Sequence, residues 1–405
     1  MRRRGTAALG IACAIALVTA ACGSDDEAGG GGGSTKIEEG ATIKVGVLAS
    51  LSGQNQQSGP GFRDGVKARL DAYHGKCNNK FDIVEGDDQS NEAGNLAATQ
   101  KLVEQDKVFT ILTDTQTFGA STDYLQSTGK GIPAIGYPFD GPSAAWFSKD
   151  NNFFKVVPIP QKGDNFATTG QFFKEQGATS VASVAFNVEP AIVGMDATEA
   201  SVKAAGLKSA LKYGNIDIMN KDVSGAVSAI MASKADGVWA AVTSDVGTQL
   251  VIALRQAGFK GLINLPIGYG GDLLKNQNQA KAAEGVTFGV ATAPVELDND
   301  ATRAEVKAFT DAKLDVTIPT TDQTAGYLTA DLLLFGLEKS GCTPTSQQFI
   351  DTVRGTSDFD GSGLLPKPMD FGSPAVDEVC QYFVTLKSGK FEPASKDPIC
   401  GDKLN

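Results

Sequence analysis

The chain has 405 residues, 36 Lys and Arg against 47 Asp and Glu, a net charge of −11 and a single histidine, His74. This length exceeds one compact core and indicates two domains. The acidic balance excludes a nucleic-acid binder that tracks phosphates, since the only basic cluster lies at residues 2–4. One histidine argues against a Ser-His-Asp triad or a histidine-rich metal site, so no catalytic residue, metal or cofactor is expected.

The amino terminus carries an export pattern. Three arginines at 2–4 precede an apolar run at 7–19 that is too short to span a bilayer, which predicts a signal peptide at 1–21. The segment Thr19-Ala-Ala-Cys22 resembles a bacterial lipobox, in which Cys22 is lipidated and becomes the first residue. Ordinary cleavage that leaves Cys22 a free thiol is the alternative. The Gly-rich residues 22–40 are expected to form a flexible tether. We therefore expect a lipid-anchored protein on the outer face of the cytoplasmic membrane, at the cell surface or in the periplasm.

Four cysteines remain after the tether: Cys77, Cys342, Cys380 and Cys400. An even number in an oxidising compartment predicts two disulfides. Cys380 and Cys400 flank a strand–turn pattern and are the most economical pair, expected with Cα atoms about 4.4–6.8 Å apart. Cys77 and Cys342 then pair by default. The long, irregular spacings disfavour a metal site.

Strands and helices alternate along the rest of the chain, which indicates an α/β protein built from right-handed βαβ units. Apolar runs predict strands in a first series at 43–49, 81–84, 108–112 and 132–135, and in a second series at 180–185, 237–242, 262–265 and 286–291. Helical periodicity predicts helices at 59–74, 93–105, 120–125, 166–176, 191–205, 223–233, 248–257, 302–313 and 323–340. A strand and hairpin turn are expected at 378–391.

Several of these segments resemble one family. They are Lys44-Val-Gly-Val-Leu-Ala-Ser-Leu-Ser-Gly53, Asp87-Asp-Gln-Ser90, Leu254-Arg-Gln-Ala-Gly-Phe259 and Tyr327 in its long helix. Their order, together with the lipobox and two α/β halves, is similar to that of type I periplasmic solute-binding proteins. The nearest branch is the leucine/isoleucine/valine-binding proteins, the receptors of branched-chain amino-acid ABC importers. The resemblance covers most of residues 41–340.

The resemblance implies two doubly wound, Rossmann-like lobes joined by a three-strand hinge. One lobe would comprise residues 41–157 plus 291–368, and the other 158–290 plus 369–405. It further implies a monomeric, non-enzymatic protein that captures an amino acid or related small carboxylate between its lobes and delivers it to ABC permease subunits. A sensor-linked binding lipoprotein and an exported α/β enzyme are the alternatives that the sequence leaves open.

Loops that follow strands of the first half are expected to face the ligand. Ser52 follows the first strand and either contacts the ligand or forms a turn. Thr115, Gln116 and Thr117 resemble the family's loop that holds a ligand carboxylate through hydroxyl and backbone N–H groups. Helix capping by Asp114 or Thr117 is the alternative.

The next loop and the second half supply further candidates. Tyr137 and Phe139 are expected as walls, with Phe118 beside them, and Asp140 either pairs an ammonium or caps a helix. Glu189, Ser244 and Asp245 stand at matching strand ends in the second half, and Tyr269 is an expected wall residue. Asp87 and Asp88 are expected to cap the helix that follows them.

Overall fold

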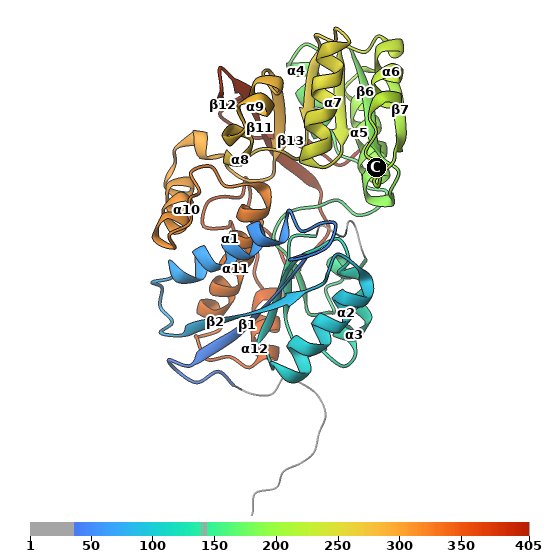
Figure 1. Cartoon of the computed structure of the whole chain (residues 1–405). Helices are drawn as coiled ribbons and strands as arrows, with labels where there is room; N and C mark the ends of the chain where they lie inside the picture. Colours follow the sequence, from blue (N-terminus) through green and yellow to red (C-terminus); the bar gives the residue numbers. More distant parts are fainter. Residues whose placement is uncertain (1–35, 139, 141–143, 405) are drawn as a thin grey trace, which may run out of the picture. The chain divides into compact units, whose positions relative to one another are not determined.

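The computed structural model describes residues 36–138, 140 and 144–404 (Figure 1). The predicted signal peptide, the lipidation site Cys22, most of the predicted tether and Phe139 lie outside the described residues.

The first lobe is built on a parallel sheet with the strand order β2-β1-β3-β4-β5. Its strands are β1 (Thr42–Ala49), β2 (Lys80–Asp87), β3 (Thr110–Asp114), β4 (Ala134–Gly136) and β5 (Phe153–Lys155). The three strands β3, β4 and β5 are buried throughout, as expected of parallel strands that are covered on both faces. The chain moves outward in opposite directions from β1 and β3, so the topological switch point of this sheet lies between them.

Helices cover both faces of this sheet. They are α1 (Gly59–Asp71), α2 (Glu92–Gln100) with a π-helical turn at Lys101–Gln105, α3 (Gly119–Gln126), α10 (Asp300–Asp311), α11 (Thr321–Lys339) and α12 (Ser346–Arg354). One apolar core joins Val45 and Val47 to α1, α11 and α12, and another joins Leu48 and Ile111 to α2 and α3. Capping boxes begin α10, α11 and α12 at Asn299, Thr320 and Thr345.

Helices α1 and α11 pack backbone against backbone (Figure 1). A Cβ on Gly65 would lie 2.0 Å from the carbonyl oxygen of Gln323, and a Cβ on Gly326 would lie 2.0 Å from that of Phe62. Only glycine permits so close an approach. The contact sets the position of the first turn of α11, which includes Asp322.

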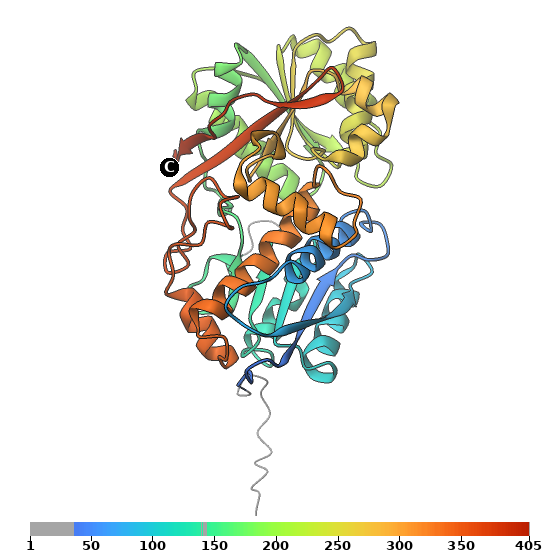
Figure 2. The same cartoon turned by 90° about the vertical axis from the view of Figure 1, so that its left-hand side faces the viewer.

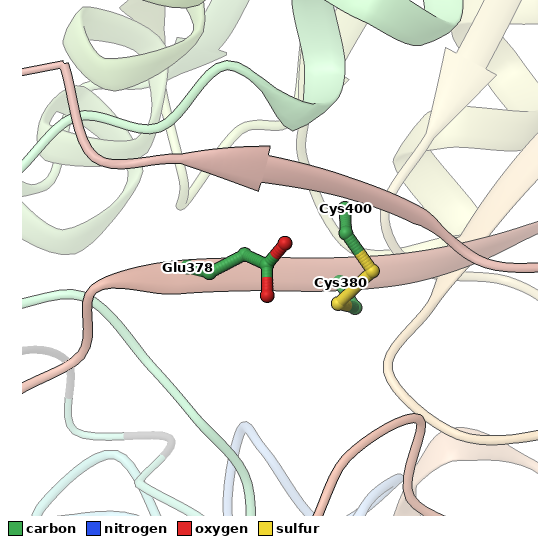
Figure 3. A group of neighbouring side chains, drawn as sticks. All are labelled: Glu378, Cys380 and Cys400. Carbon is green, nitrogen blue, oxygen red and sulfur yellow. A yellow bond between two sulfur atoms is a disulfide. The ribbon is translucent and has the colours of Figure 1, made fainter.

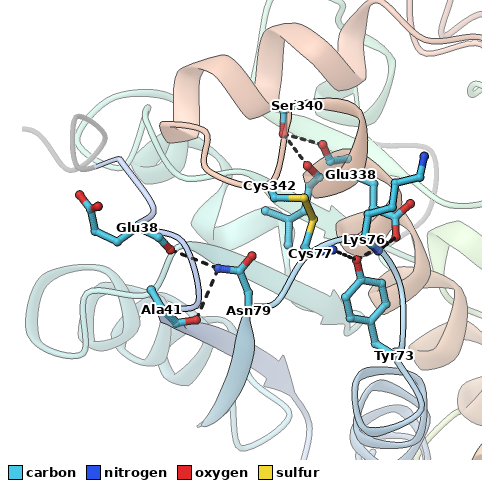
Figure 4. The surroundings of a disulfide bond; sticks show 11 residues. Glu38, Ala41, Tyr73, Lys76, Cys77, Asn79, Glu338, Ser340 and Cys342 are labelled. Carbon is cyan, nitrogen blue, oxygen red and sulfur yellow. Dashed lines mark hydrogen bonds between the residues drawn. A yellow bond between two sulfur atoms is a disulfide. The ribbon is translucent and has the colours of Figure 1, made fainter.

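A disulfide ties the far ends of the same two helices (Figure 4). Cys77 lies just after α1 and Cys342 just after α11, with Cα atoms 5.2 Å apart. The Tyr73 hydroxyl donates to Glu338 at 2.8 Å and accepts from the Cys77 amide, and burial raises the pKa of Tyr73 to about 12. The default pairing of these cysteines is therefore confirmed.

The second lobe is built on a larger sheet with the order β12-β11-β10-β9-β8-β6-β7, and β13 pairs with β11. Its strands are β6 (Ser180–Phe186), β7 (Lys208–Ile216), β8 (Gly237–Ala241), β9 (Leu262–Leu265), β10 (Val286–Val290), β11 (Glu378–Lys387), β12 (Lys390–Pro393) and β13 (Ile399–Asp402). Its helices are α4 (Thr168–Glu175), α5 (Glu189–Ala204), α6 (Ser224–Ser233), α7 (Ser244–Gln256), α8 (Gly271–Lys275) and α9 (Gln277–Ala282). Figure 2 shows the carboxyl-terminal strands, in red, completing this sheet. Its switch point lies between β6 and β8.

Cys380 and Cys400 are directly opposite each other on β11 and β13 and form the predicted disulfide. Their Cα atoms are 3.9 Å apart, which is shorter than the expected range of about 4.4–6.8 Å, so the lower limit of that expectation was wrong. Directly opposed residues of an antiparallel pair have Cα atoms about 4.5–5.5 Å apart, so the ladder brings these two cysteines together, and the bonded pair is closer still.

Three segments connect the two sheets: the chain after β5, the chain after β10 and the chain before β11. At the first of them the buried Lys155 ammonium donates to the carbonyl oxygen of Pro374 at 2.8 Å and lies 3.9 Å from the Phe147 ring centroid. Burial lowers the pKa of Lys155 to about 7. These contacts tie β5 to the segment that precedes β11.

Gly65→Ala is expected to lower the free energy of unfolding by about 1–3 kcal/mol, because the new methyl group meets backbone that cannot move aside. Gly61→Ala is the matched control on the same helix, since its nearest neighbour would lie at an ordinary 3.4 Å. Both positions lie in α1, so each change also brings some gain in helix propensity. Urea unfolding of the two variants measures the difference, and equal stabilities would contradict the close contact.

Candidate functional site

Small molecules bind open α/β sheets beyond the carboxyl ends of the strands, at the switch point. In the first lobe this place is formed by the loops after β1 and β3, with the loop after β4 beside them. In the second lobe it is formed by the loops after β6 and β8, where Glu189 and Ser244 begin α5 and α7. Most of the residues suggested by the sequence lie at these strand ends.

Asp87 organises the loop after β1. Its carboxylate accepts hydrogen bonds from the amides of Leu51 and Ser52, each at 3.1 Å, and from the Ser52 hydroxyl at 2.6 Å. These hydrogen bonds outweigh desolvation and lower the pKa of Asp87. Asn91, rather than Asp87 or Asp88, caps α2, so the expected capping role of the two acids was wrong.

Asp88 organises the loop after β3. It is completely buried, and its Oδ2 accepts hydrogen bonds from the hydroxyls of Thr115 and Thr117, the latter at 2.8 Å. A hydroxyl has only one hydrogen to donate, so neither of these two is left to donate to a ligand. Gln116 is exposed, and its side-chain oxygen accepts from Asn55 at 3.1 Å.

Asp114 ends β3, where the sequence had suggested a loop residue. Its side chain is 1% exposed, and neither carboxylate oxygen has a hydrogen-bond partner. Burial raises the pKa of Asp114 well above its usual value, and the charges of Asp322 and Asp140 raise it further. A buried, unpaired carboxyl group is rare in native proteins and commonly marks a functional site.

Two other carboxyl groups lie close to Asp114. The Asp140 Oδ1 accepts a 2.8 Å hydrogen bond from the Trp146 indole, whereas its buried Oδ2 has no partner. Asp322 lies in the first turn of α11. Burial raises the pKa of each of these acids to about 6. The pKa of Tyr137 is raised by burial and then by the charges of Asp114 and Asp322, and the Tyr137 amide donates to the carbonyl oxygen of Thr113, next to Asp114, at 3.1 Å.

The aromatic residues expected as walls differ in their surroundings. Phe118 packs in the core between Trp146 and Phe153, at ring-centroid distances of 5.1 Å and 5.8 Å, so its placement as a wall was wrong. Tyr269 is 8% exposed, and its ring contacts Phe391. Its hydroxyl donates to Glu296 at 2.7 Å and accepts from the Val295 amide, which ties the loop after β9 to the segment after β10.

The two acidic candidates of the second lobe, Glu189 and Asp245, are paired with lysines. Glu189 is exposed and pairs with Lys162. Asp245 accepts from Thr243 at 2.5 Å and from Lys221 at 2.9 Å, and these contacts lower its pKa against the effect of burial. Ser244 is exposed and lines a cavity of about 10 Å³, which has room for about one water molecule.

The segment before α11 also meets the second lobe. The Gly271 amide donates to the Ile318 carbonyl oxygen at 2.8 Å, and the Gly270 backbone lies against Thr320. Nearby, Glu305 is buried, accepts a 2.7 Å hydrogen bond from Thr324 and has its pKa raised to about 7 by burial. Asp322 and Glu305 were not predicted from the sequence, because they lie in α11 and α10 rather than in loops that follow strands.

One group of potential metal ligands occurs within the described part of the chain, at Glu378, Cys380 and Cys400 (Figure 3). The two sulfur atoms are bonded to each other, so neither is a thiolate, and Glu378 pairs with Lys367. This group is therefore a structural disulfide with a neighbouring ion pair.

A family model described as periplasmic binding protein matches residues 42–389 of the chain. The chain belongs to this family. The two lobes are those of the type I periplasmic-binding-protein fold, as the resemblance in the sequence implied. No curated protein sequence matches the chain. Within the described residues, no helix combines the length and the apolarity that a membrane crossing requires.

Solved structures share this periplasmic-binding-protein fold at low sequence identity. A solute-binding protein of an ABC transporter from R. palustris, in complex with 4-hydroxybenzoate, is 19% identical, with a TM-score of 0.72 over 88% of this chain and 96% of that one. A leucine-binding protein from Thermotoga maritima is 17% identical, with a TM-score of 0.71 over 87% and 98%. A branched-chain amino-acid transporter substrate-binding protein from Streptococcus pneumoniae, in complex with isoleucine, is 19% identical, with a TM-score of 0.70 over 89% and 99%.

Asp114→Asn is expected to stabilise the ligand-free protein at pH 8 by about 1–3 kcal/mol, because folding either protonates Asp114 or buries its charge without a partner, and both cost free energy at this pH. An acid whose pKa is raised by folding contributes stability below its unfolded pKa and loses it as the pH rises through the folded pKa. The gain should therefore shrink towards pH 4. Thermal melting across this range measures it, with the exposed Asp123→Asn as control. A destabilised Asp114→Asn variant at pH 8 would contradict the absence of a partner.

Proposed function

We propose that this periplasmic binding protein is the extracytoplasmic, lipid-anchored solute-binding component of an ABC importer. It captures an amino acid or a related small carboxylate between its lobes and delivers it to the permease. The solute binds at the carboxyl ends of β3 and β4, beside Asp114, Tyr137 and Asp140. We expect Gln116 in the first lobe, and Glu189 and Ser244 in the second, to border the bound solute, because each follows a strand next to a switch point.

The buried, unpaired carboxyl group of Asp114 is the observation that carries this proposal. It lies at the end of the strand that borders the switch point, where α/β proteins bind small molecules. Its burial would only destabilise a protein that used it for structure. A carboxyl group retained there against that cost indicates that a ligand supplies the missing partner.

The export pattern and the family support the cellular role. A lipidated Cys22 and a Gly-rich tether would hold the folded lobes beside the membrane, where a permease can receive the solute. Structures of the same fold were solved with isoleucine and with 4-hydroxybenzoate, so the fold accommodates both an amino acid and a simple aromatic carboxylate.

A thermal-melting screen tests the capture of a small solute. We expect at least one α-amino acid or small carboxylate to raise the melting temperature, and about 2.7 kcal/mol of added stability at about 100 times its dissociation constant. The screen should include the twenty amino acids, their des-amino carboxylates and neutral sugars. Stabilisation by sugars alone, or by no solute at all, would contradict the proposal, as would the release of a reaction product.

A further inference from the structure

We propose that the first lobe binds the positively charged group of the solute, with Asp114, Asp140 and Tyr137 around it and Asp322 closing the site from α11. The solute is accordingly a small organic amine, either an amino acid or an amine without a carboxylate. This inference rests on the proposed function, and it reverses the polarity that the resemblance implied for the loop after β3.

The hydroxyl groups of the loop after β3 are already used as donors. The hydroxyl hydrogens of Thr115 and Thr117 point to Asp88. The Thr117 amide donates to the Thr115 hydroxyl at 3.3 Å, and the amides of Ala120 and Ser121 donate to carbonyl oxygens one turn back. The loop therefore offers the anionic end of a solute no hydroxyl hydrogen, only backbone amides.

At the carboxyl ends of β3 and β4, several carboxylate oxygens can accept hydrogen bonds but have no donor. Both oxygens of Asp114 and one oxygen of Asp140 are buried without a partner. Asp322 approaches them from a third element, and no cationic side chain is among the causes that shift the pKa of any of the three acids. Three acids without a counter-ion form a site of negative potential, which an ammonium or guanidinium group would neutralise.

The arrangement suits an organic cation better than a bare metal ion. In the described part of the chain, Asp114, Asp140 and Asp322 do not form a group of three residues whose potential ligand atoms all lie within 4.8 Å of one another. A divalent ion with oxygen ligands at about 2.0–2.6 Å would require a tighter cluster. Tyr137 adds an aromatic ring beside Asp114 and Asp322, and organic ammonium groups bind favourably to aromatic faces.

Binding of a cation should be coupled to proton release. The pKa values of Asp114, Asp140 and Asp322 are raised by burial; the titratable groups that interact with them are one another and Tyr137, and the Trp146 indole donates to Asp140. Asp88, on the neighbouring loop, is already held by Thr115 and Thr117. A bound ammonium favours the ionised carboxylates, so protons leave as the solute enters. Affinity should therefore rise with pH between about 5 and 8, up to about tenfold per pH unit for each proton released.

Calorimetry on the purified full chain tests this polarity with matched probes: the twenty amino acids, the amines that lack only their carboxyl groups, and the carboxylates that lack only their amino groups. We expect binding by amino acids or amines and none by the carboxylates. Binding by the carboxylates alone would overturn this inference and leave the proposed function standing. Binding by no probe would overturn the proposed function itself. Stabilisation by Ca²⁺ or Mg²⁺ alone would show a metal site instead.

Substitutions then test the residues with the amine probe that binds best. Asp114→Asn should weaken binding about 10- to 100-fold, since charge-assisted hydrogen bonds are lost, and should reduce the proton release measured in buffers of different ionisation enthalpy. Asp322→Asn should reduce the affinity and the proton release to a smaller extent. It serves as the second variant if Asp114→Asn does not fold. Asp123→Asn, an exposed acid on α3, should change neither. Unchanged affinity and unchanged proton release in both site variants would overturn the inference.

Discussion

The close contact between α1 and α11 is the constraint on which the candidate site depends. Gly65 and Gly326 let the two backbones touch, and the Cys77–Cys342 disulfide holds the far ends of the same helices. The first turn of α11 is thereby held at the carboxyl ends of β3 and β4, with Asp322 beside Asp114. A helix displaced by one side-chain layer would remove one of the three acids from the site.

Sheet topology and electrostatics identify the same place by separate arguments. The strand order places the switch point between β1 and β3, and the carboxyl group without a partner is at the end of β3. Polar groups in the loops on either side already have hydrogen-bond partners. Asp87 holds the loop after β1, and Asp88 holds the loop after β3. The polar groups around the site thus stabilise its shape, whereas Asp114 is left for another partner.

The fold was predictable from the sequence to a large extent, because buried parallel strands are apolar throughout and the helices between them show a clear period. The missed strand β7 is a polar edge strand, and the missed helix α12 is only nine residues long, so both carry weak patterns. The site was less predictable. Loop residues such as Thr115 and Tyr269 were found, but their hydrogen-bond partners Asp88 and Glu296 come from other elements. Asp322 and Asp114 meet only through tertiary packing, which no local pattern records.

Asp114 is a buried acid without a partner in the protein alone, and we expect it to be a paired carboxylate in the complex. Carboxyl ¹³C NMR of the labelled aspartates, titrated between pH 3 and pH 9 with and without the bound amine, measures this state directly. We expect a pKa for Asp114 well above about 4 in the empty protein and a clearly lower one in the complex. An ordinary pKa near about 4 in both states would contradict the central claim, because the carboxyl group would then already have its partner.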